Sequence, residues 1–206
     1  DIFKNPKSPI DLKVTVAGLD LRGKQKVPAT IKGICISFYY KESDAAMLMY
    51  LAVDPAYRTE GLGNALFKHH NSVVIATARA NGGKLTGSYI SMQDPQKPLT
   101  PEHQKFDKYD PQKRLDKYAA WGGQQIPFDY IYGVQAGNTV ETGDECVLMA
   151  FKHPVDGTYP SREQTLKFMR SLWRGYGVEE PEKHPAFQKM AQSYKKPPQP
   201  RGPKAL

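Results

Sequence analysis

Hydrophobic and polar residues alternate along the first third of the chain as expected for two neighbouring strands. From Ile31 to Tyr40 the chain has the period of a strand, with Ile34, Ile36, Phe38 and Tyr40 on one face. From Met47 to Val53 the chain is almost continuously apolar, as in a strand buried on both faces. The short polar segment 41–44 between them predicts an antiparallel hairpin.

A helical period replaces the strand period after residue 60. Apolar or neutral residues follow at steps of four and three from residue 61 to residue 80, and 81–83 (Asn-Gly-Gly) ends the predicted helix. The expected inward-facing positions are Leu62, Leu66, His69, Val73, Ala76 and Ala80. On this stripe His69 is expected to be a partly buried, hydrogen-bonded side chain and not a catalytic group. A strand at 84–92 follows, which makes a parallel strand–helix–strand unit with a right-handed crossover.

The second half of the chain has a less regular pattern. Asp110-Pro111 predicts the start of a helix that ends near Gly122, because Asp is a favoured N-cap and Pro a favoured first helical residue. Two further strands are expected, at residues 128–135 and 145–152. Ser161 and Gln164 form a capping-box pair that begins an amphipathic helix. Its expected apolar face consists of Leu166, Met169, Leu172, Trp173 and Tyr176.

These elements divide the chain into four parts. Residues 1–30 form a short, partly irregular N-terminal segment with one short strand at 12–16, and residues 31–154 form the core. Residues 155–195 are a helical extension, and residues 196–206 are a proline-rich, basic tail. With 206 residues, of which 39% are hydrophobic, the chain has enough apolar side chains for one core, so a single α/β domain of the α+β kind is expected.

The net charge of +8 comes entirely from the two ends of the chain. Residues 31–180 contain seventeen basic and seventeen acidic side chains, so the expected core is neutral. A nucleic-acid-binding face needs basic residues clustered on the folded part, and the distribution therefore argues against nucleic acid as a partner.

Several common features are missing from the sequence. No apolar run is long enough to span a membrane, and the first residues contain no apolar signal segment, so a cytoplasmic location is expected. Cys35 and Cys146 lie in strand-like apolar runs, where two free thiols of a reducing compartment are expected instead of a disulfide or a metal site. No Cys/His cluster has metal-ligand spacing, and no metal is expected.

The stretch from Leu51 to Leu66 carries the candidate chemistry. An apolar strand ends at Val53, a turn with a proline follows, and Arg58-x-x-Gly61-x-Gly63 opens the helix. The first N–H groups of a helix lack intrahelical partners and lie at the positive end of its dipole, and glycines let an anion approach them. This pattern predicts a phosphate or pyrophosphate site. A Walker loop is absent, and the dinucleotide fingerprint would need glycine where Leu66 stands.

The ordered set of strand, Val53-Asp-Pro, Tyr57-Arg-x-x-Gly-x-Gly and long helix resembles the acyl-CoA signature of the GNAT superfamily of N-acyltransferases. The resemblance implies one mixed, mostly antiparallel sheet flanked by helices, with a central parallel strand–helix–strand unit. It also implies that acetyl-CoA is the co-substrate, with its pantetheine arm along residues 51–53 and its thioester carbonyl polarised by the N–H of Val53. The donor-site residues implied in this way are Leu51, Ala52, Val53, Arg58, Thr59, Glu60, Gly61, Leu62, Gly63, Asn64 and Arg114. Glu60 departs from the small or basic residues usual in the family and should weaken the attraction for phosphate.

The same resemblance places a general acid in the second helix of the core. The family has a Tyr four residues before a Gly, and Tyr118 precedes Gly122 in this way. A phenol with a pKa near about 10 suits protonation of a leaving thiolate, although a Tyr packed in the core would give the same pattern. Where the family often has an Asn, this chain has Pro111, and Arg114 is the substitute expected to contact the donor.

No carboxylate on the signature strand can deprotonate the amine. Asp94, after the next strand, is the candidate base and would act through water. Because it precedes Pro95, the alternative is a residue that only shapes a turn.

The resemblance fails at the start of the chain. The family usually has a strand and two helices before the hairpin, and these form one wall of the acceptor site. Residues 1–30 have no helical period, so either the wall is built differently or part of the natural chain is missing. The expected function is acetyl transfer from acetyl-CoA to a primary amine of a small molecule or peptide. The alternative is a non-catalytic acyl-CoA-binding or interaction module with the same fold.

Overall fold

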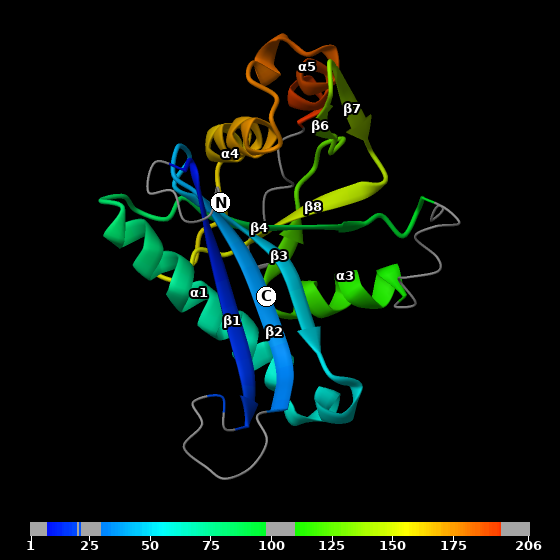
Figure 1. The fold of residues 1–206 in the computed structure, drawn as a ribbon. Helices are drawn as coiled ribbons and strands as arrows, with labels where there is room; N and C mark the ends of the chain where they lie inside the picture. Colours follow the sequence, from blue (N-terminus) through cyan, green and yellow to red (C-terminus); the bar gives the residue numbers. More distant parts are fainter. Residues whose placement is uncertain (1–7, 20, 22–29, 98–109, 195–206) are drawn as a thin grey trace, which may run out of the picture.

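A six-stranded sheet forms the centre of the molecule in the computed structural model, which describes residues 8–19, 21, 30–97 and 110–194 (Figure 1). The strand order is β1-β2-β3-β4-β8-β5. These strands span Ile10–Leu19 (β1), Thr30–Tyr40 (β2), Ala45–Val53 (β3), Gly87–Gln93 (β4), Cys146–Phe151 (β8) and Gly123–Gln125 (β5). Only β3 and β4 pair in parallel, while all other neighbours are antiparallel. The predicted mixed, mostly antiparallel sheet is therefore confirmed.

Helices cover both faces of this sheet. The helical elements are η1 (Pro55–Glu60), α1 (Leu62–Ala80), α3 (Pro111–Ala120), α4 (Arg162–Gly175), η2 (Pro181–Lys183) and α5 (Pro185–Ser193). A separate hairpin consists of β6 (Tyr132–Ala136) and β7 (Thr139–Gly143). Figure 1 shows α4 and α5 with this hairpin at one end of the molecule, away from α1 and α3.

The predicted helix starts are confirmed by their caps. The Asp110 carboxylate accepts hydrogen bonds from the N–H groups of Gln112 and Lys113 at 2.8 and 3.2 Å. Ser161 and Gln164 form both bonds of the capping box, at 3.2 and 2.7 Å. Such caps satisfy N–H groups that the helix leaves without partners, which is why the local sequence sets these boundaries.

Alternate residues of each strand face opposite sides. On β2, Ser37 bonds to His70 of α1, while Tyr40 packs edge-on against Phe168 of α4 at 5.6 Å between ring centroids. On β4, Tyr89 stacks on the same Phe168 at 4.1 Å. We call the two sides of the sheet the α1 face and the α4 face.

The C-terminal segment shares one core with the sheet. On the α4 face, side chains of α4 and α5 pack in one apolar cluster with side chains of β2, β3, β4 and β8. The C-terminal segment thus supplies the second helical layer of the fold.

Three sequence predictions on strands are corrected. β1 spans ten residues and pairs with β2 along its whole length, so it is longer than the strand expected at 12–16. The strand expected at 84–92 begins later and ends one residue later, as β4. The third correction concerns residues 128–135, which do not join the sheet.

The segment 128–135 pairs with β7 in its last part, as β6, and lies under α4 in its first part. β4 pairs along one edge of β8, and β5 pairs with Met149–Phe151 on the other edge, so β5 takes the place in the sheet that was expected for this segment. The backbone of Ile131 finds side-chain partners instead. Its carbonyl accepts a bond from the Trp173 indole at 3.2 Å, and its N–H points to the sulfur of Met190 at 3.5 Å.

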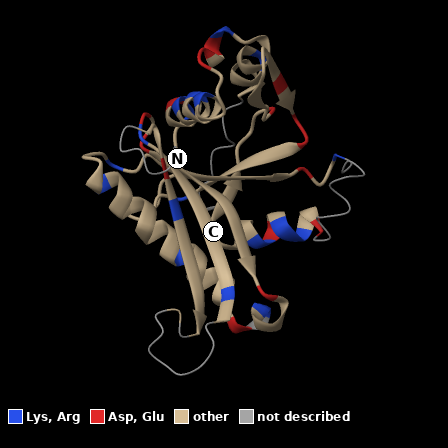
Figure 2. Ribbon diagram, in the orientation of Figure 1, with Lys and Arg blue, Asp and Glu red and all other residues tan. Residues whose placement is uncertain are grey.

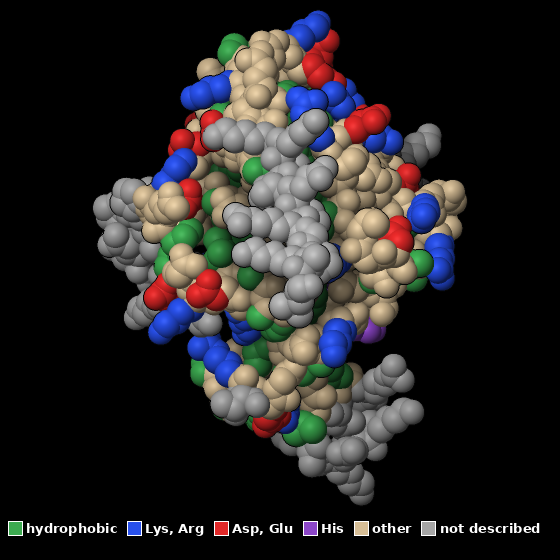
Figure 3. Space-filling model, turned by 180° about the vertical axis from the view of Figure 1, so that it is seen from behind, with side chains coloured by type: hydrophobic (Ala, Val, Ile, Leu, Met, Phe, Trp, Pro, Cys, Tyr) green, Lys and Arg blue, Asp and Glu red, His purple; other side chains and the backbone are tan. Residues whose placement is uncertain are grey.

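On one face of the molecule the described charged side chains lie mostly near the outline (Figure 3). In the view from behind, hydrophobic side chains gather towards the middle of the face, and most Lys, Arg, Asp and Glu side chains lie around its outline (Figure 3). No helix among the described residues is long and apolar enough to cross a membrane.

The predicted inward stripe of α1 is wrong by one position over most of its length. The buried residues of α1 are Gly63, Leu66, Phe67, His70, Val74, Thr77 and Ala78. His69 is exposed, and its neighbour His70 is the buried histidine. Phe67 and Val74 are the reason, because the helix buries more apolar surface when this pair faces the sheet than when Val73 and Ala76 do.

His70 lies between two serine hydroxyls. Ser37 Oγ is 2.6 Å from its Nδ1, and Ser88 Oγ is 3.2 Å from its Nε2. Burial lowers the pKa of His70 from 6.5 to about 4, so the ring stays neutral at physiological pH.

This burial makes stability depend on pH. The unfolded chain takes up the proton below pH 6.5 while the folded protein resists it until about pH 4, so stability is full above 6.5 and falls as the pH is lowered. We expect the His70 contribution to the free energy of unfolding to fall by about 2 kcal/mol between pH 7 and pH 5. Urea unfolding at pH 7 and at pH 5 measures this fall in the free energy of unfolding, in the wild type and in His70→Gln and His69→Gln. His69→Gln should keep the wild-type fall, and an unchanged fall in His70→Gln would contradict the assignment.

Candidate active site

The two parallel strands separate soon after they meet. β3 and β4 pair over three positions, from Ala45 with Gly87 to Met47 with Tyr89. A register shift between Ile36 and Ser37 of β2 leaves Met49 of β3 as an extra, bulged residue just past this point. A bulge bends a strand and increases its twist, so β3 turns away from β4 here. In Figure 1 the ends of the two strands point in different directions.

The separated part of β3 has an edge with no strand partner among the described residues. The N–H of Asp54 donates to the carbonyl of Lys32 on β2 at 2.9 Å. Because bonded positions alternate along an antiparallel pair, Ala52 bonds to β2 as well, and Leu51 and Val53 direct their N–H and C=O groups to the other side. These are two of the residues for which the resemblance implies contact with the pantetheine arm. Ala52 itself directs its backbone to β2.

The turn after β3 has its own internal support. Asp54 caps η1, with its carboxylate accepting the N–H of Ala56 at 2.8 Å. Nε of Arg58 donates to the carbonyl of Val53 at 3.3 Å. Arg58 is exposed, so its remaining guanidinium N–H groups are available at the end of the β3 edge.

Gly61 forms the entry to α1 in the left-handed conformation, with φ of 73°. Among the described side chains none caps this helix end, so the first N–H groups, at Leu62, Gly63 and Asn64, are left for another acceptor. A Cβ at Gly61 would have no atom within 4 Å, which leaves the space in front of the backbone open. These open amides are compatible with an anion site, which stays a prediction.

Gly63 lies on the inner side of the same turn. A Cβ there would lie 3.5 Å from the Trp121 ring, 3.7 Å from Leu51 and 3.7 Å from Val53. Trp121 therefore packs beside the turn and the free edge of β3, and it also stacks on Phe67 at 5.2 Å. Trp121 was not predicted from the sequence, although it lies one residue before Gly122 in the segment that points to Tyr118.

Three further predicted donor-site residues are Glu60, Thr59 and Arg114. Glu60 is exposed, and its carboxylate lies 3.9 Å from the Lys32 ammonium, which offsets part of the negative charge beside the anion site. The side chain of Thr59 lies outside the described residues. Arg114 is half-buried on α3 and makes an interaction within the protein. Contact between Arg114 and the donor stays a prediction.

Tyr118 is buried on α3, next to the separation of the strands. It belongs to the apolar cluster on the α1 face. The buried members of that cluster are Cys35, Leu48, Leu66, Phe67, Ile90, Met92, Tyr118, Val147, Met149 and Phe151. They include residues of β3 and β4 that lie beyond the last parallel pair. Tyr118 meets Trp121 edge-on at 5.4 Å and Phe151 at 6.1 Å between centroids.

Asp94 takes part in a turn after β4. Its carboxylate accepts the N–H of Gln96 at 2.9 Å, and its own N–H donates to the carbonyl of Glu145 at 2.9 Å. The turn that the sequence offered as the alternative is therefore observed, and a role as base stays a prediction.

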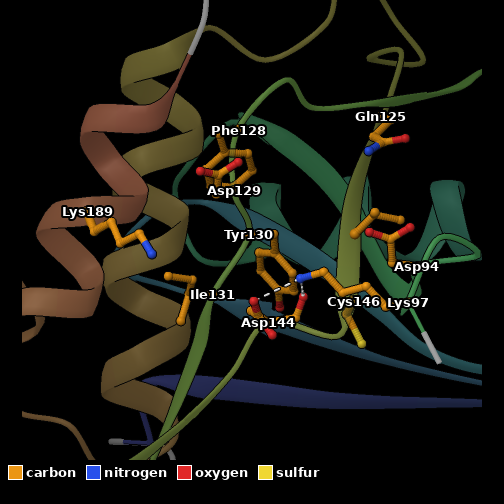
Figure 4. A pocket seen from close by; sticks show the side chains of 11 residues that line it. Asp94, Lys97, Gln125, Phe128, Asp129, Tyr130, Ile131, Asp144, Cys146 and Lys189 are labelled. Atoms are coloured by element: carbon orange, nitrogen blue, oxygen red, sulfur yellow. Dashed lines mark hydrogen bonds and ion pairs between the residues drawn. The ribbon is translucent and has the colours of Figure 1, made fainter. Parts of the chain in front are cut away.

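Asp94 also lines a cavity of about 230 Å³ on the side of α5 (Figure 4). Lys97 and Asp144 form an ion pair across it, at 2.9 Å, and Lys189 reaches in from α5. Tyr118 is not among the residues that line this cavity. The structure therefore does not bring the predicted acid and the predicted base into one pocket.

No group of His, Cys, Asp and Glu in the described part of the chain has an arrangement that would hold a metal ion. Cys35 and Cys146 are both free thiols.

Comparisons with known proteins give matches to solved structures alone. No family model and none of the curated proteins matches the chain. Nourseothricin acetyltransferase shares 16% identity over 71% of this chain and 68% of its own, with a TM-score of 0.43. A protein of Bacteroides thetaiotaomicron named as a GNAT-family acetyltransferase shares 13% identity over 85% of this chain and 77% of its own, with a TM-score of 0.49. An acetyltransferase of Bacillus cereus shares 15% over 69% and 72%, with a TM-score of 0.37. All three carry the name acetyltransferase, and at these identities the similarity concerns the fold.

Proposed function

We propose that this protein is an N-acetyltransferase that transfers an acetyl group from acetyl-CoA to a primary amine. The observation that carries the proposal is the separation of β3 from β4, which leaves Leu51 and Val53 without a strand partner on this edge among the described residues, directly before the open amides of Leu62, Gly63 and Asn64. An extended ligand with amide groups pairs with such an edge as an added strand does, and its diphosphate fits the helix start.

The chemistry required of this site is modest. Acetyl-CoA supplies an acetyl group activated as a thioester. The amine nitrogen forms a bond to the acetyl carbon, the carbon–sulfur bond breaks, and the thiolate takes a proton. N–H groups on the free edge of β3, with Val53 as the predicted donor, stabilise the negative charge that develops on the carbonyl oxygen.

Proton transfer is assigned to Tyr118 and, through water, to Asp94. The Tyr118 hydroxyl donates a proton to the leaving thiolate and recovers one from solvent, since the two groups have similar basicity. The amine loses its proton to water, with Asp94 as the candidate acceptor beyond that water.

Two glycines at opposite ends of α1 provide a matched test. Gly61 and Gly82 have φ of 73° and 76°, and a Cβ added at either position would have no atom within 4 Å. Gly61→Glu and Gly82→Glu therefore introduce the same backbone strain and the same charge. We expect both to lower stability by about 1–2 kcal/mol. In isothermal titration calorimetry, Gly61→Glu should weaken acetyl-CoA binding at least about tenfold, whereas Gly82→Glu should bind like the wild type.

The results of this titration distinguish the transferase from the non-catalytic acyl-CoA-binding module. Saturable binding that only Gly61→Glu weakens, together with release of free CoA in the presence of an amine panel, supports the transferase. Binding without CoA release for any amine favours the non-catalytic acyl-CoA-binding module. Absence of acetyl-CoA binding by the wild type would refute both.

A further inference from the structure

Part of the α4 face of the sheet carries no charged side chain. Asp11 of β1 bonds to Asn81 at the end of α1, and Ser37 of β2 bonds to His70, so both side chains lie on the α1 face. The residues that alternate with them along β1 and β2 therefore lie on the α4 face. The side chains that share this part of the α4 face are Leu12, Val14, Val16, Ile34, Ile36, Tyr50 and Ala52. Figure 2 shows the same strands almost entirely without charge colours, in contrast to α3.

The helices cover only one end of this surface. Ile10, Phe38 and Met49 pack against the cluster under α4 and α5. Further along the strands, Val14 is 52% exposed and Tyr50 is 65% exposed. A sheet face of this size without charge and with exposed aromatic and branched side chains is typical of a binding surface.

Tyr50 connects the surface to the proposed active site. It follows the bulged Met49 and precedes Leu51, whose backbone lies on the free edge of β3. Tyr176, at the end of α4, lies near it: burial raises the pKa of Tyr176, and the nearby Tyr50 phenol adds to the rise. The α1 face is closed at the same level by Leu66, Tyr118 and Trp121. An amine that approaches the separated strands from the α4 face passes Tyr50.

We propose that the acceptor is a primary amine on an apolar body with no further charge, and that this body lies on Val14, Ile36 and Tyr50. The inference rests on the proposed transferase function and names its substrate class. An acceptor with a second cation or a carboxylate finds no opposite charge among the side chains of this surface, and binding would leave that charge desolvated and unpaired. An apolar body gains by covering the exposed side chains.

Equilibrium binding of two probe amines tests the inference without turnover. The full chain is titrated with 2-phenylethylamine and with putrescine, each with and without saturating CoA. We expect 2-phenylethylamine to bind at least about tenfold tighter than putrescine. Tyr50→Ala and Val14→Lys should each weaken 2-phenylethylamine about fivefold or more. Val155→Ala is the control, because Val155 is 67% exposed on the loop after β8, outside this surface, and it should leave binding unchanged.

The outcomes separate this inference from the function on which it rests. Tighter binding of putrescine, or unchanged affinity in Tyr50→Ala and Val14→Lys, would overturn the inference, and acetyl-CoA binding would still support the transferase. Binding of 2-phenylethylamine without any binding of acetyl-CoA would refute the transferase but keep the surface as an amine site. Light scattering that shows a dimer dissociated by Val14→Lys would identify the surface as an interface between copies and would also overturn the inference.

Discussion

Replacing Tyr118 by phenylalanine is expected to lower kcat about a hundredfold while the KM for acetyl-CoA changes little. The substitution keeps the ring in its apolar cluster with Trp121 and Phe151 and removes the hydroxyl alone. Loss of a positioned general acid typically costs about 10²–10⁴ in rate, and a thiolate leaving group places the effect at the lower end. Steady-state release of free CoA with a responsive amine measures it.

Tyr159→Phe is the matched control for this substitution. The Tyr159 hydroxyl donates to the carbonyl of Gly122 at 3.1 Å, at the end of α3, and it lies outside the cluster of Tyr118. It should therefore keep wild-type kcat. If Tyr118→Phe keeps kcat within about twofold of the wild type, Tyr118 is a core residue and the proton comes from another donor.

The second large effect concerns the layer that covers the α4 face. Trp173→Ala is expected to lower the free energy of unfolding by about 3–5 kcal/mol, because it empties a fully buried site. Trp173 packs against Phe187 of α5 at 5.3 Å between centroids, and its indole N–H bonds to Ile131. The cost thus includes both lost packing and a buried carbonyl without its partner. Chemical denaturation followed by circular dichroism measures it.

Trp173→Phe separates the two contributions. It keeps most of the ring volume and removes the N–H donor, so a loss of about 1–3 kcal/mol is expected. Acetyl-CoA binding should persist in Trp173→Phe, since Gly61 and the edge of β3 lie outside this cluster. A cost below about 1 kcal/mol for Trp173→Ala would show that α4 and α5 contribute little to the fold.

Asp94, the candidate base, has a structural role after β4. Asp94 shapes the turn after β4 and lines the cavity beside α5, and that cavity lacks Tyr118. A route through water from the amine to Asp94 is thus a prediction of the sequence alone.

Local sequence determined most of the elements and the start of the donor site. Asp110 with Pro111, and Ser161 with Gln164, set helix boundaries through bonds within a few residues, which a sequence displays directly. The motif Arg58-x-x-Gly61-x-Gly63 likewise predicted a helix start at this place, and the structure adds that Gly61 enters the helix in the left-handed conformation. The alternating period fixed which residues of β2 share a face.

The tertiary structure decided how these elements meet. Whether His69 or His70 faces the sheet depends on the fit of Phe67 and Val74 against distant strands, and adjacent stripes of one helix have similar local patterns. The segment 128–135 looked like a sheet strand, but β5 pairs with the end of β8 instead, and the backbone of Ile131 bonds to side chains of α4 and α5. The separation of β3 from β4 likewise depends on a pairing register between remote segments. Helix caps and hydrophobic periods depend on residues close together in the sequence, so the sequence shows them directly. Strand pairing and helix packing depend on residues far apart in the sequence, so only the tertiary structure decides them.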